Sequence, residues 1–128
     1  YAVCPNARNL KDDQIKALAG RGGVMGMNAW PDFISSDGKP TLEKFADHVD
    51  HIVELVGIDH ISLGFDFCDF LDSGSTQSFQ ETALTATPEI ENASEIPNFL
   101  RVLKGYNEEE LKKISYKNIM RVVREILG

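Results

Sequence analysis

Asp66 is the residue of this chain whose position most favours chemistry. It follows a run of apolar residues that predicts a buried strand, namely Ile58, Ile61, Leu63 and Phe65. Folds of the α/β class keep their catalytic groups at the carboxyl ends of parallel strands, and a carboxylate there can bind a cation or carry a proton. Structural aspartates also begin loops at such places, so both interpretations are open for the residue taken alone.

Three other side chains lie where they could meet a ligand. Arg8 falls in a predicted loop, and its planar guanidinium could bind a carboxylate through two parallel N–H donors. A solvated loop arginine is the commoner case. Asn28 follows a second apolar run at the carboxyl end of a predicted strand. Trp30 comes two residues later and could line a pocket or cover the core.

The histidines do not predict a metal site. His48 and His51 are three residues apart on a predicted helix, a spacing that could hold a metal ion. Pairing with Asp47 and Asp50 on the helix surface is the better interpretation. His60 opens the second predicted strand, at the end that serves stability rather than catalysis in α/β folds.

Composition limits the partners and the location of the chain. A net charge of -7 over 128 residues argues against nucleic acid and against anionic membrane surfaces, since both would repel the protein. No apolar run approaches the roughly 20 residues of a membrane helix. Cys4 and Cys68 predict free thiols in a reducing compartment, with a disulfide or a metal role as the alternatives. We therefore expect no nucleic-acid partner, no membrane segment and a cytoplasmic location.

Hydrophobic periodicity predicts the elements that must position these side chains. The segments are a loop at 1–9, a helix at 10–20 capped by Asn9, a strand at 22–28, a loop at 29–40, a helix at 41–56 capped by Thr41, a strand at 58–66, a long loop at 68–94 and helices at 95–127. A helix between two strands predicts a parallel pair with a right-handed crossover. Two parallel strands are too few for a free-standing sheet, so we expect a piece of a larger α/β protein.

Seven short motifs follow one another along the chain. They are Cys4-Pro5-Asn6-Ala7-Arg8-Asn9-Leu10, Arg21-Gly22-Gly23-Val24-Met25-Gly26-Met27-Asn28, Asp47-His48-Val49-Asp50-His51-Ile52, Val56-Gly57-Ile58-Asp59-His60, Gly64-Phe65-Asp66-Phe67, Ile90-Glu91-Asn92-Ala93-Ser94 and Asn118-Ile119-Met120-Arg121-Val122. In combination, order and spacing they resemble the C-terminal part of the membrane dipeptidase (renal dipeptidase) family of zinc peptidases. The resemblance covers the chain except the middle of residues 68–89.

This resemblance implies the C-terminal portion of a (β/α)8 metal-dependent hydrolase barrel, with two zinc ions at the C-terminal face of the strands. Such enzymes cleave dipeptides with a metal-activated water. Arg8 falls on the family's arginine that binds the substrate carboxylate. Asp66 falls on the family's aspartate that contacts the free amino group and carries a proton in catalysis. Because a dipeptide is a zwitterion, one cation and one anion would fix its two ends and reject longer peptides.

The chain departs from the family pattern in two places. The family's zinc ligands are a His-x-Asp pair, a glutamate and two later histidines, and all of them precede the position of Tyr1. No metal ligand is therefore expected here, and the isolated segment should be inactive without the N-terminal barrel part. The usual Ser-Asp-Phe-Asp-Gly is replaced by Phe65-Asp66-Phe67-Cys68-Asp69, which displaces the second acid and the glycine and so alters the loop.

Two other functions remain as alternatives. A non-catalytic α/β interaction or self-assembling module would explain the missing metal ligands. Open strand edges and apolar helix faces favour self-association, so we expect a homo-oligomer. A phosphoacceptor domain is weaker, since it needs additional acids near the first strand and the sequence shows no such set.

Overall fold

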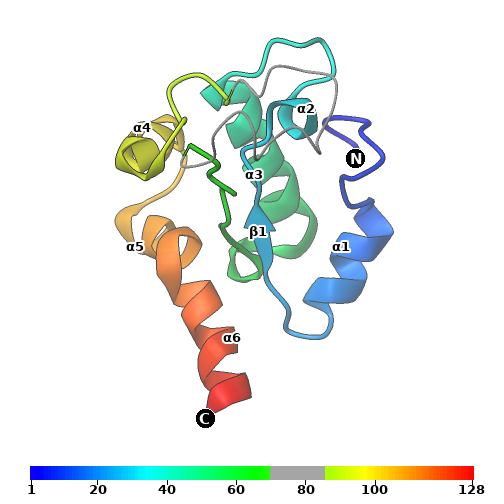
Figure 1. Ribbon diagram of the computed structural model, residues 1–128. Helices are drawn as coiled ribbons and strands as arrows, with labels where there is room; N and C mark the ends of the chain where they lie inside the picture. Colours follow the sequence, from blue (N-terminus) through cyan, green and yellow to red (C-terminus); the bar gives the residue numbers. More distant parts are fainter. Residues whose placement is uncertain (70–85) are drawn as a thin grey trace.

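The computed structural model describes residues 1–69 and 86–128. Its helices and strands are α1 (Asp12–Ala19), β1 (Met25–Met27), α2 (Pro31–Ile34), α3 (Leu42–Val56), β2 (Ile61–Leu63), α4 (Ile96–Val102), α5 (Glu108–Lys112) and α6 (Asn118–Leu127). Short 3-10 turns at Ile58–His60 and Ala93–Glu95 precede β2 and α4, and a π-helical segment at Lys113–Lys117 joins α5 to α6. The strand β1 lies centrally, with α1 on one side and α4 to α6 on the other (Figure 1).

The two strands are parallel, and α3 connects them as the predicted crossover. Met25 pairs with Ile61 and Met27 with Leu63. The chain just after β2 lies close to the middle of β1, because a Cβ on Gly64 would lie 2.9 Å from the Cα of Gly26. Both strands run toward the same edge, so the residues after Met27 and after Leu63 emerge side by side.

An aromatic cluster forms the centre of the core. The rings of Phe45 on α3 and Phe99 on α4 stack at a centroid distance of 4.5 Å, and Phe65, just after β2, packs edge-on against both. Phe45 and Phe99 are fully buried, and Phe65 is 6% exposed. Burying rings of this size contributes strongly to folding. The cluster fixes the residue directly before Asp66.

Several boundaries differ from the predicted ones. The ladder covers three residues in each strand rather than 22–28 and 58–66. Gly22 has a φ of 77°, which belongs to a turn and not to a strand, and Ile58–His60 is a 3-10 turn. The long loop predicted at 68–94 falls largely outside the described residues. A short helix, α2, occupies part of the segment predicted as a loop before Thr41.

The helix α1 starts later than predicted, and the proposed Asn9 cap is wrong. Lys11 is the cap residue, and the Gln14 side chain accepts from its backbone N–H at 2.9 Å. The amide of Asn9 donates instead to the carbonyls of Cys4 and Phe33. By contrast, the Thr41 hydroxyl does cap α3, accepting from the N–H of Lys44.

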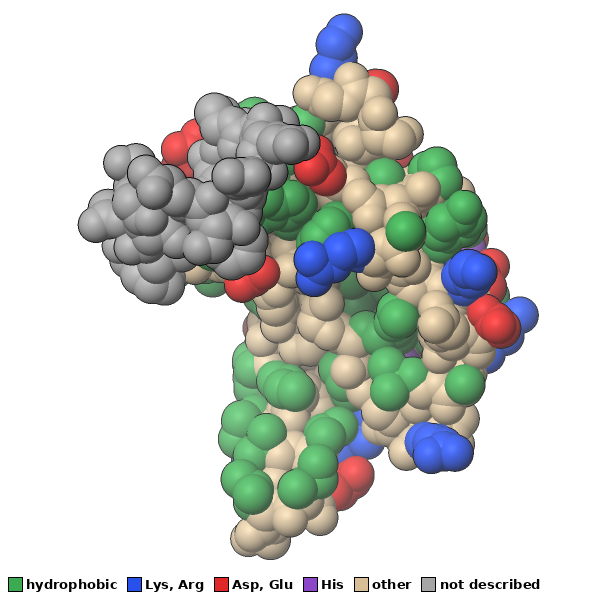
Figure 2. All heavy atoms as spheres, turned by 45° about the vertical axis from the view of Figure 1, so that its right-hand side comes forward, with side chains coloured by type: hydrophobic (Ala, Val, Ile, Leu, Met, Phe, Trp, Pro, Cys, Tyr) green, Lys and Arg blue, Asp and Glu red, His purple; other side chains and the backbone are tan. Residues whose placement is uncertain are grey.

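The last helix carries an exposed apolar face. Figure 2 shows hydrophobic side chains gathered over its length, and the exposed ones are Ile119, Met120, Val123, Ile126 and Leu127. Asn118 and Arg121 attach the opposite side of α6 to backbone carbonyls before and within β2 and after α1. Within residues 1–69 and 86–128, every helix falls short of the length and apolar character needed to cross a membrane.

Candidate functional site

Asp66 and Asn28 meet at the carboxyl edge of the two strands. Asn28 is the residue after β1, and Asp66 lies three residues after the end of β2. The Asn28 side-chain Nδ2–H donates to Asp66 Oδ2 at 3.1 Å, while its Oδ1 accepts from the backbone N–H of Trp30 at 2.8 Å. Both ends of the amide are therefore engaged. The Asp66 side chain is exposed, so its carboxylate can also meet a ligand.

The backbone around Asp66 is held by contacts from three segments. Asp66 has a φ of 62°, a left-handed conformation that aspartate tolerates better than most residues. On one side the Phe65 carbonyl accepts from the N–H of Ala29 at 3.1 Å, and on the other the Cys68 thiol donates to the Asp66 carbonyl at 3.3 Å. The buried hydroxyl of Thr87 donates to the Ala29 carbonyl at 2.7 Å. A hydrogen bond at this separation in sequence leaves no local signal, and sequence reasoning missed Thr87.

Arg8 lies on the loop before α1, against the short helix α2. Its guanidinium carbon is 5.3 Å from the centroid of the Phe33 ring, within the range of a cation–π contact. Its backbone N–H donates to the Asn6 side chain at 2.9 Å. Among the described residues, no carboxylate lies within 4 Å of the guanidinium. Arg8 is thus oriented by an aromatic face, and no acidic side chain in the described part of the chain neutralises it.

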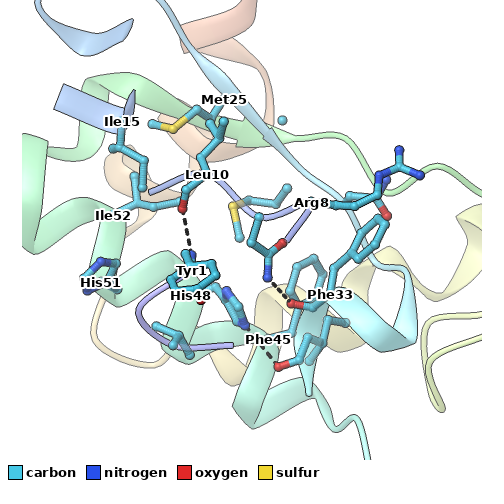
Figure 3. Close-up of a pocket in the computed structure, with 16 residues that line it drawn as sticks. Tyr1, Arg8, Leu10, Ile15, Met25, Phe33, Phe45, His48, His51 and Ile52 are labelled. Atoms are coloured by element: carbon cyan, nitrogen blue, oxygen red, sulfur yellow. Dashed lines mark hydrogen bonds between the residues drawn. The ribbon is translucent and has the colours of Figure 1, made fainter. Parts of the chain in front are cut away.

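A cavity of about 260 Å³ opens beside β1. Arg8, Asn28 and Phe33 are among its lining residues, whereas Trp30 and Asp66 are not. Arg8 and Phe33 lie on one side of it and His51 on the other (Figure 3). The structure therefore joins Arg8 and Asn28 through one cavity, and Asn28 and Asp66 through one hydrogen bond.

Trp30 follows Asn28 by two residues and is partly buried. Its ring is 6.5 Å from that of Phe33, at a tilt of 43°. Its backbone, and not its indole, makes the contact with Asn28. The indole is therefore a neighbour of the Phe33 ring, on which the Arg8 guanidinium lies, rather than part of the cavity wall.

All three histidines are engaged with structural partners. His48 Nε2–H donates to the Ile34 carbonyl at 3.1 Å, and His60 Nδ1–H donates to the Gly23 carbonyl at 2.9 Å, at the end of the strands opposite Asp66. His51 Nε2 bonds Asp12 of α1 at 2.9 Å, and this hydrogen bond is the main cause that lowers the Asp12 pKa. Burial lowers the pKa of His48. The predicted partners on the same helix, Asp47 and Asp50, are replaced by groups on neighbouring elements.

The described residues do not fit a metal centre. Among them, no three histidine, cysteine, aspartate or glutamate side chains gather closely enough to hold an ion. Cys4 is buried and Cys68 partly so, and neither forms a disulfide. Asp66 offers a single carboxylate, which falls short of the three protein ligands of a catalytic zinc site.

Comparison with known proteins decides the family. The family model described as "Membrane dipeptidase (Peptidase family M19)" matches residues 1–127. The chain belongs to the membrane dipeptidase family. The resemblance inferred from the seven motifs is thereby confirmed.

Two curated relatives match nearly the whole chain. The uncharacterized protein in the pqqA 5' region of Klebsiella pneumoniae is 29% identical over 132 residues, covering 98% of this chain and 44% of that protein. Dipeptidase tcpJ of Claviceps purpurea is 30% identical over 129 residues, covering 98% and 27%. The chain thus spans less than half the length of each of these two relatives.

Solved structures give the same picture of the fold. A metallo peptidase from Rhodobacter sphaeroides, solved with a phosphinate mimic of the dipeptide L-Ala-D-Ala, matches at a TM-score of 0.77 and 25% identity, over 96% of this chain and 33% of that one. An amidohydrolase from Pseudomonas aeruginosa matches at a TM-score of 0.87 and 22% identity, over 98% and 42%, and shows the fold alone. The predicted fold class is confirmed, since the chain matches part of larger metallo-dipeptidase and amidohydrolase barrels.

Proposed function

We propose that the complete protein hydrolyses dipeptides with the help of zinc and that this segment supplies the two charges that recognise the substrate. The observation that carries the proposal is the Asn28–Asp66 pair, which presents a carboxylate at the carboxyl edge of parallel strands in a chain of the membrane dipeptidase family. Enzymes of α/β barrels keep their active sites at this edge.

Arg8 is the proposed ligand of the substrate carboxylate. The guanidinium rests on an aromatic face, and its N–H donors in the ring plane suit the two oxygens of a carboxylate. The Rhodobacter sphaeroides protein that matches this chain was solved with a dipeptide mimic, which supports a dipeptide as the substrate. We expect a C-terminal carboxylate to be required for tight binding.

Asp66 is the proposed partner of the substrate amino group and the carrier of a proton. A positioned carboxylate that transfers a proton contributes about 10²- to 10⁴-fold to a rate. The hydrogen bond from Asn28 holds one carboxylate oxygen at 3.1 Å and so restrains the carboxylate. Asn28 therefore serves as a support for Asp66, and a direct contact with substrate is the second role that we propose for it. For Trp30 we propose an apolar contact with the substrate side chains.

Zinc would supply the activated water and polarise the scissile bond. Because the described residues hold no cluster of three metal-binding side chains, the ions would be held by other parts of the complete protein. The N-terminal barrel part is thus the partner that the segment needs. We also propose a cytoplasmic location, in line with the thiols at Cys4 and Cys68.

Kinetics of the complete protein test the proposal. With zinc, it should cleave a dipeptide, and Asp66→Asn should lower kcat about 100-fold or more. Arg8→Ala should raise KM for the dipeptide about 10- to 100-fold, the value of a charge-assisted bidentate contact, and leave the dipeptide amide unaffected. Arg101→Ala is the matched control, since Arg101 is exposed and bonds only Asn98 among described residues. Full activity of Asp66→Asn, or dipeptide turnover by the isolated 128 residues, would overturn the assignment.

A non-catalytic self-assembling or interaction module is the second candidate. One observation favours it, the exposed apolar face of α6, on which Ile126 is 74% and Leu127 79% exposed. Such a face favours packing against a partner or a second copy. Light scattering of the isolated chain should then show oligomers that Ile126→Glu with Leu127→Glu dissociates. A monomer at high concentration counts against this candidate and against the predicted homo-oligomer.

A further inference from the structure

The loop that carries Arg8 is fastened to α2 by side-chain amides. Asn6 Nδ2–H donates to the Asp32 carbonyl at 3.1 Å, and Asn9 Nδ2–H donates to the Phe33 carbonyl at 2.8 Å. A helix leaves its last carbonyls without partners inside the helix, and α2 has only four residues. The two asparagines that flank Arg8 therefore bond carbonyls that α2 cannot satisfy itself. This fixes the Arg8 loop to α2.

The side chain of Phe33 then orients the guanidinium. Its ring lies below the Arg8 side chain, with 5.3 Å between the guanidinium carbon and the ring centroid, and the close-up shows the two next to each other at one side of the cavity (Figure 3). An arginine restrained by an aromatic face loses less conformational freedom when it binds an anion. A flexible arginine on a loop would have to be ordered by the substrate.

The same segment of chain also reaches the other charge. Asn28, five residues before Phe33, donates to Asp66 and accepts from the backbone of Trp30. The short stretch from Asn28 to Phe33 therefore contacts Asp66 at one end and Arg8 at the other. A rigid connection between the two contacts would keep the cation and the anion at a constant separation.

We propose that Phe33 is the positioning residue for Arg8 and that the segment from Asn28 to Phe33 sets the spacing of the two charges that select dipeptides. This inference rests on the proposed function, because it assigns Arg8 to the substrate carboxylate. Phe33 acts through Arg8 and does not itself touch the reacting atoms. Its effect should therefore appear in the recognition of the carboxylate and in no other step.

The test uses the complete protein with zinc and two substrates, a dipeptide and the same dipeptide with a C-terminal amide. Phe33→Met keeps an apolar side chain but removes the ring. It should raise KM for the dipeptide about two- to fivefold, the size of an exposed cation–π contact, and leave kcat unchanged. Constants for the amide should not change. Phe33→Tyr, which restores a ring, should restore the KM of the parent protein.

A double substitution separates positioning from a general loss of stability. In an Arg8→Ala background, Phe33→Met should have no further effect on KM for the dipeptide. Tyr106→Leu is the control, because Tyr106 is a partly buried aromatic residue bonded to Asp50, away from the loop. It should lower the unfolding temperature without changing KM.

The outcomes distinguish the two proposals. If Arg8→Ala leaves KM for the dipeptide unchanged, the assignment of Arg8 in the proposed function fails. If Arg8→Ala raises KM but Phe33→Met does not, or raises it equally for the amide, the positioning role of Phe33 is overturned. Should Phe33→Met fold poorly, Asn9→Ala tests the same platform by removing the hydrogen bond to the Phe33 carbonyl, and unchanged KM for the dipeptide would equally refute the inference.

Discussion

Removal of the Asn118 side chain should weaken the attachment of the C-terminal helices to the sheet. Asn118 is 4% exposed, and its amide donates both hydrogens, to the carbonyl of Ile58 at 2.7 Å and to that of Ile61 at 2.8 Å. Each hydrogen bond contributes about 1 kcal/mol net, and a buried carbonyl left without a donor costs about 1–3 kcal/mol. We therefore expect Asn118→Ala to lower the free energy of unfolding by about 2–4 kcal/mol, a large share of the stability of a typical domain.

Asn118→Asp sharpens the test because it keeps the size and removes the donors. The introduced carboxylate would face two carbonyl oxygens, so its pKa should rise in the folded state. When the pKa of an acid is raised in the folded state, the free energy of unfolding falls as the pH rises above the pKa of that acid in the unfolded chain, about 3.9 for aspartate. The variant should thus be least stable at neutral pH and recover toward pH 4.

Urea unfolding followed by circular dichroism measures both effects. Asn98→Ala is the matched control, since Asn98 also donates to a carbonyl, that of Glu89 at 2.9 Å, but at an exposed place. It should cost no more than about 1 kcal/mol. A loss for Asn118→Ala no larger than that of the control, or a pH-independent loss for Asn118→Asp, would refute the reasoning.

Two further predictions concern the sheet and the cavity. Gly64→Ala should destabilise the protein by about 1–3 kcal/mol in urea unfolding, since its Cβ would lie 2.9 Å from backbone. Gly26→Ala is the control and should be tolerated, because its Cβ would lie 3.4 Å from its nearest neighbour. Equal losses for the two variants would contradict this prediction. Burial lowers the pKa of His48, so its neutral form stabilises the fold above the unfolded value of about 6.5, and that contribution falls with the pH below it. The difference in unfolding free energy between the parent and His48→Gln should therefore shrink from pH 7.5 to pH 5, and a constant difference would exclude the effect.

Local patterns predicted the elements that depend on local interactions. The helix between the strands was predicted at 41–56 from its apolar stripe and Thr41, and the structure has α3 at Leu42–Val56 with that threonine as its cap. Its position between two apolar runs also predicted the parallel pairing. These features follow from residues adjacent in sequence or one helical turn apart.

Features that depend on distant residues could not be predicted. The loop predicted before Thr41 contains α2, a helix of four residues that carries too little periodicity to be detected. Its role became visible only through the amides of Asn6 and Asn9, more than twenty residues away. The partner of His51 is likewise Asp12, on another helix. For the site, the sequence predicted Asp66, Arg8, Asn28 and Trp30 as candidates. It could not show that Asn28 donates to the Asp66 carboxylate or that Arg8 lies on the Phe33 ring.

The position of Asp66 in the candidate site depends on long-range contacts rather than on the sheet. Strands of three residues provide few ladder hydrogen bonds, and Asp66 lies beyond the ladder in a left-handed conformation that costs most residues free energy. Phe65 in the aromatic core, Asn28 after β1 and the Thr87–Ala29 hydrogen bond fix that place from three directions. Thr87→Val keeps the buried volume but loosens the edge next to Asp66. Expressed as free energies, its effect on kcat of the complete protein should therefore exceed its effect on the free energy of unfolding. A matched loss from Asn98→Ala, which lies off this edge, would show that general loosening is responsible.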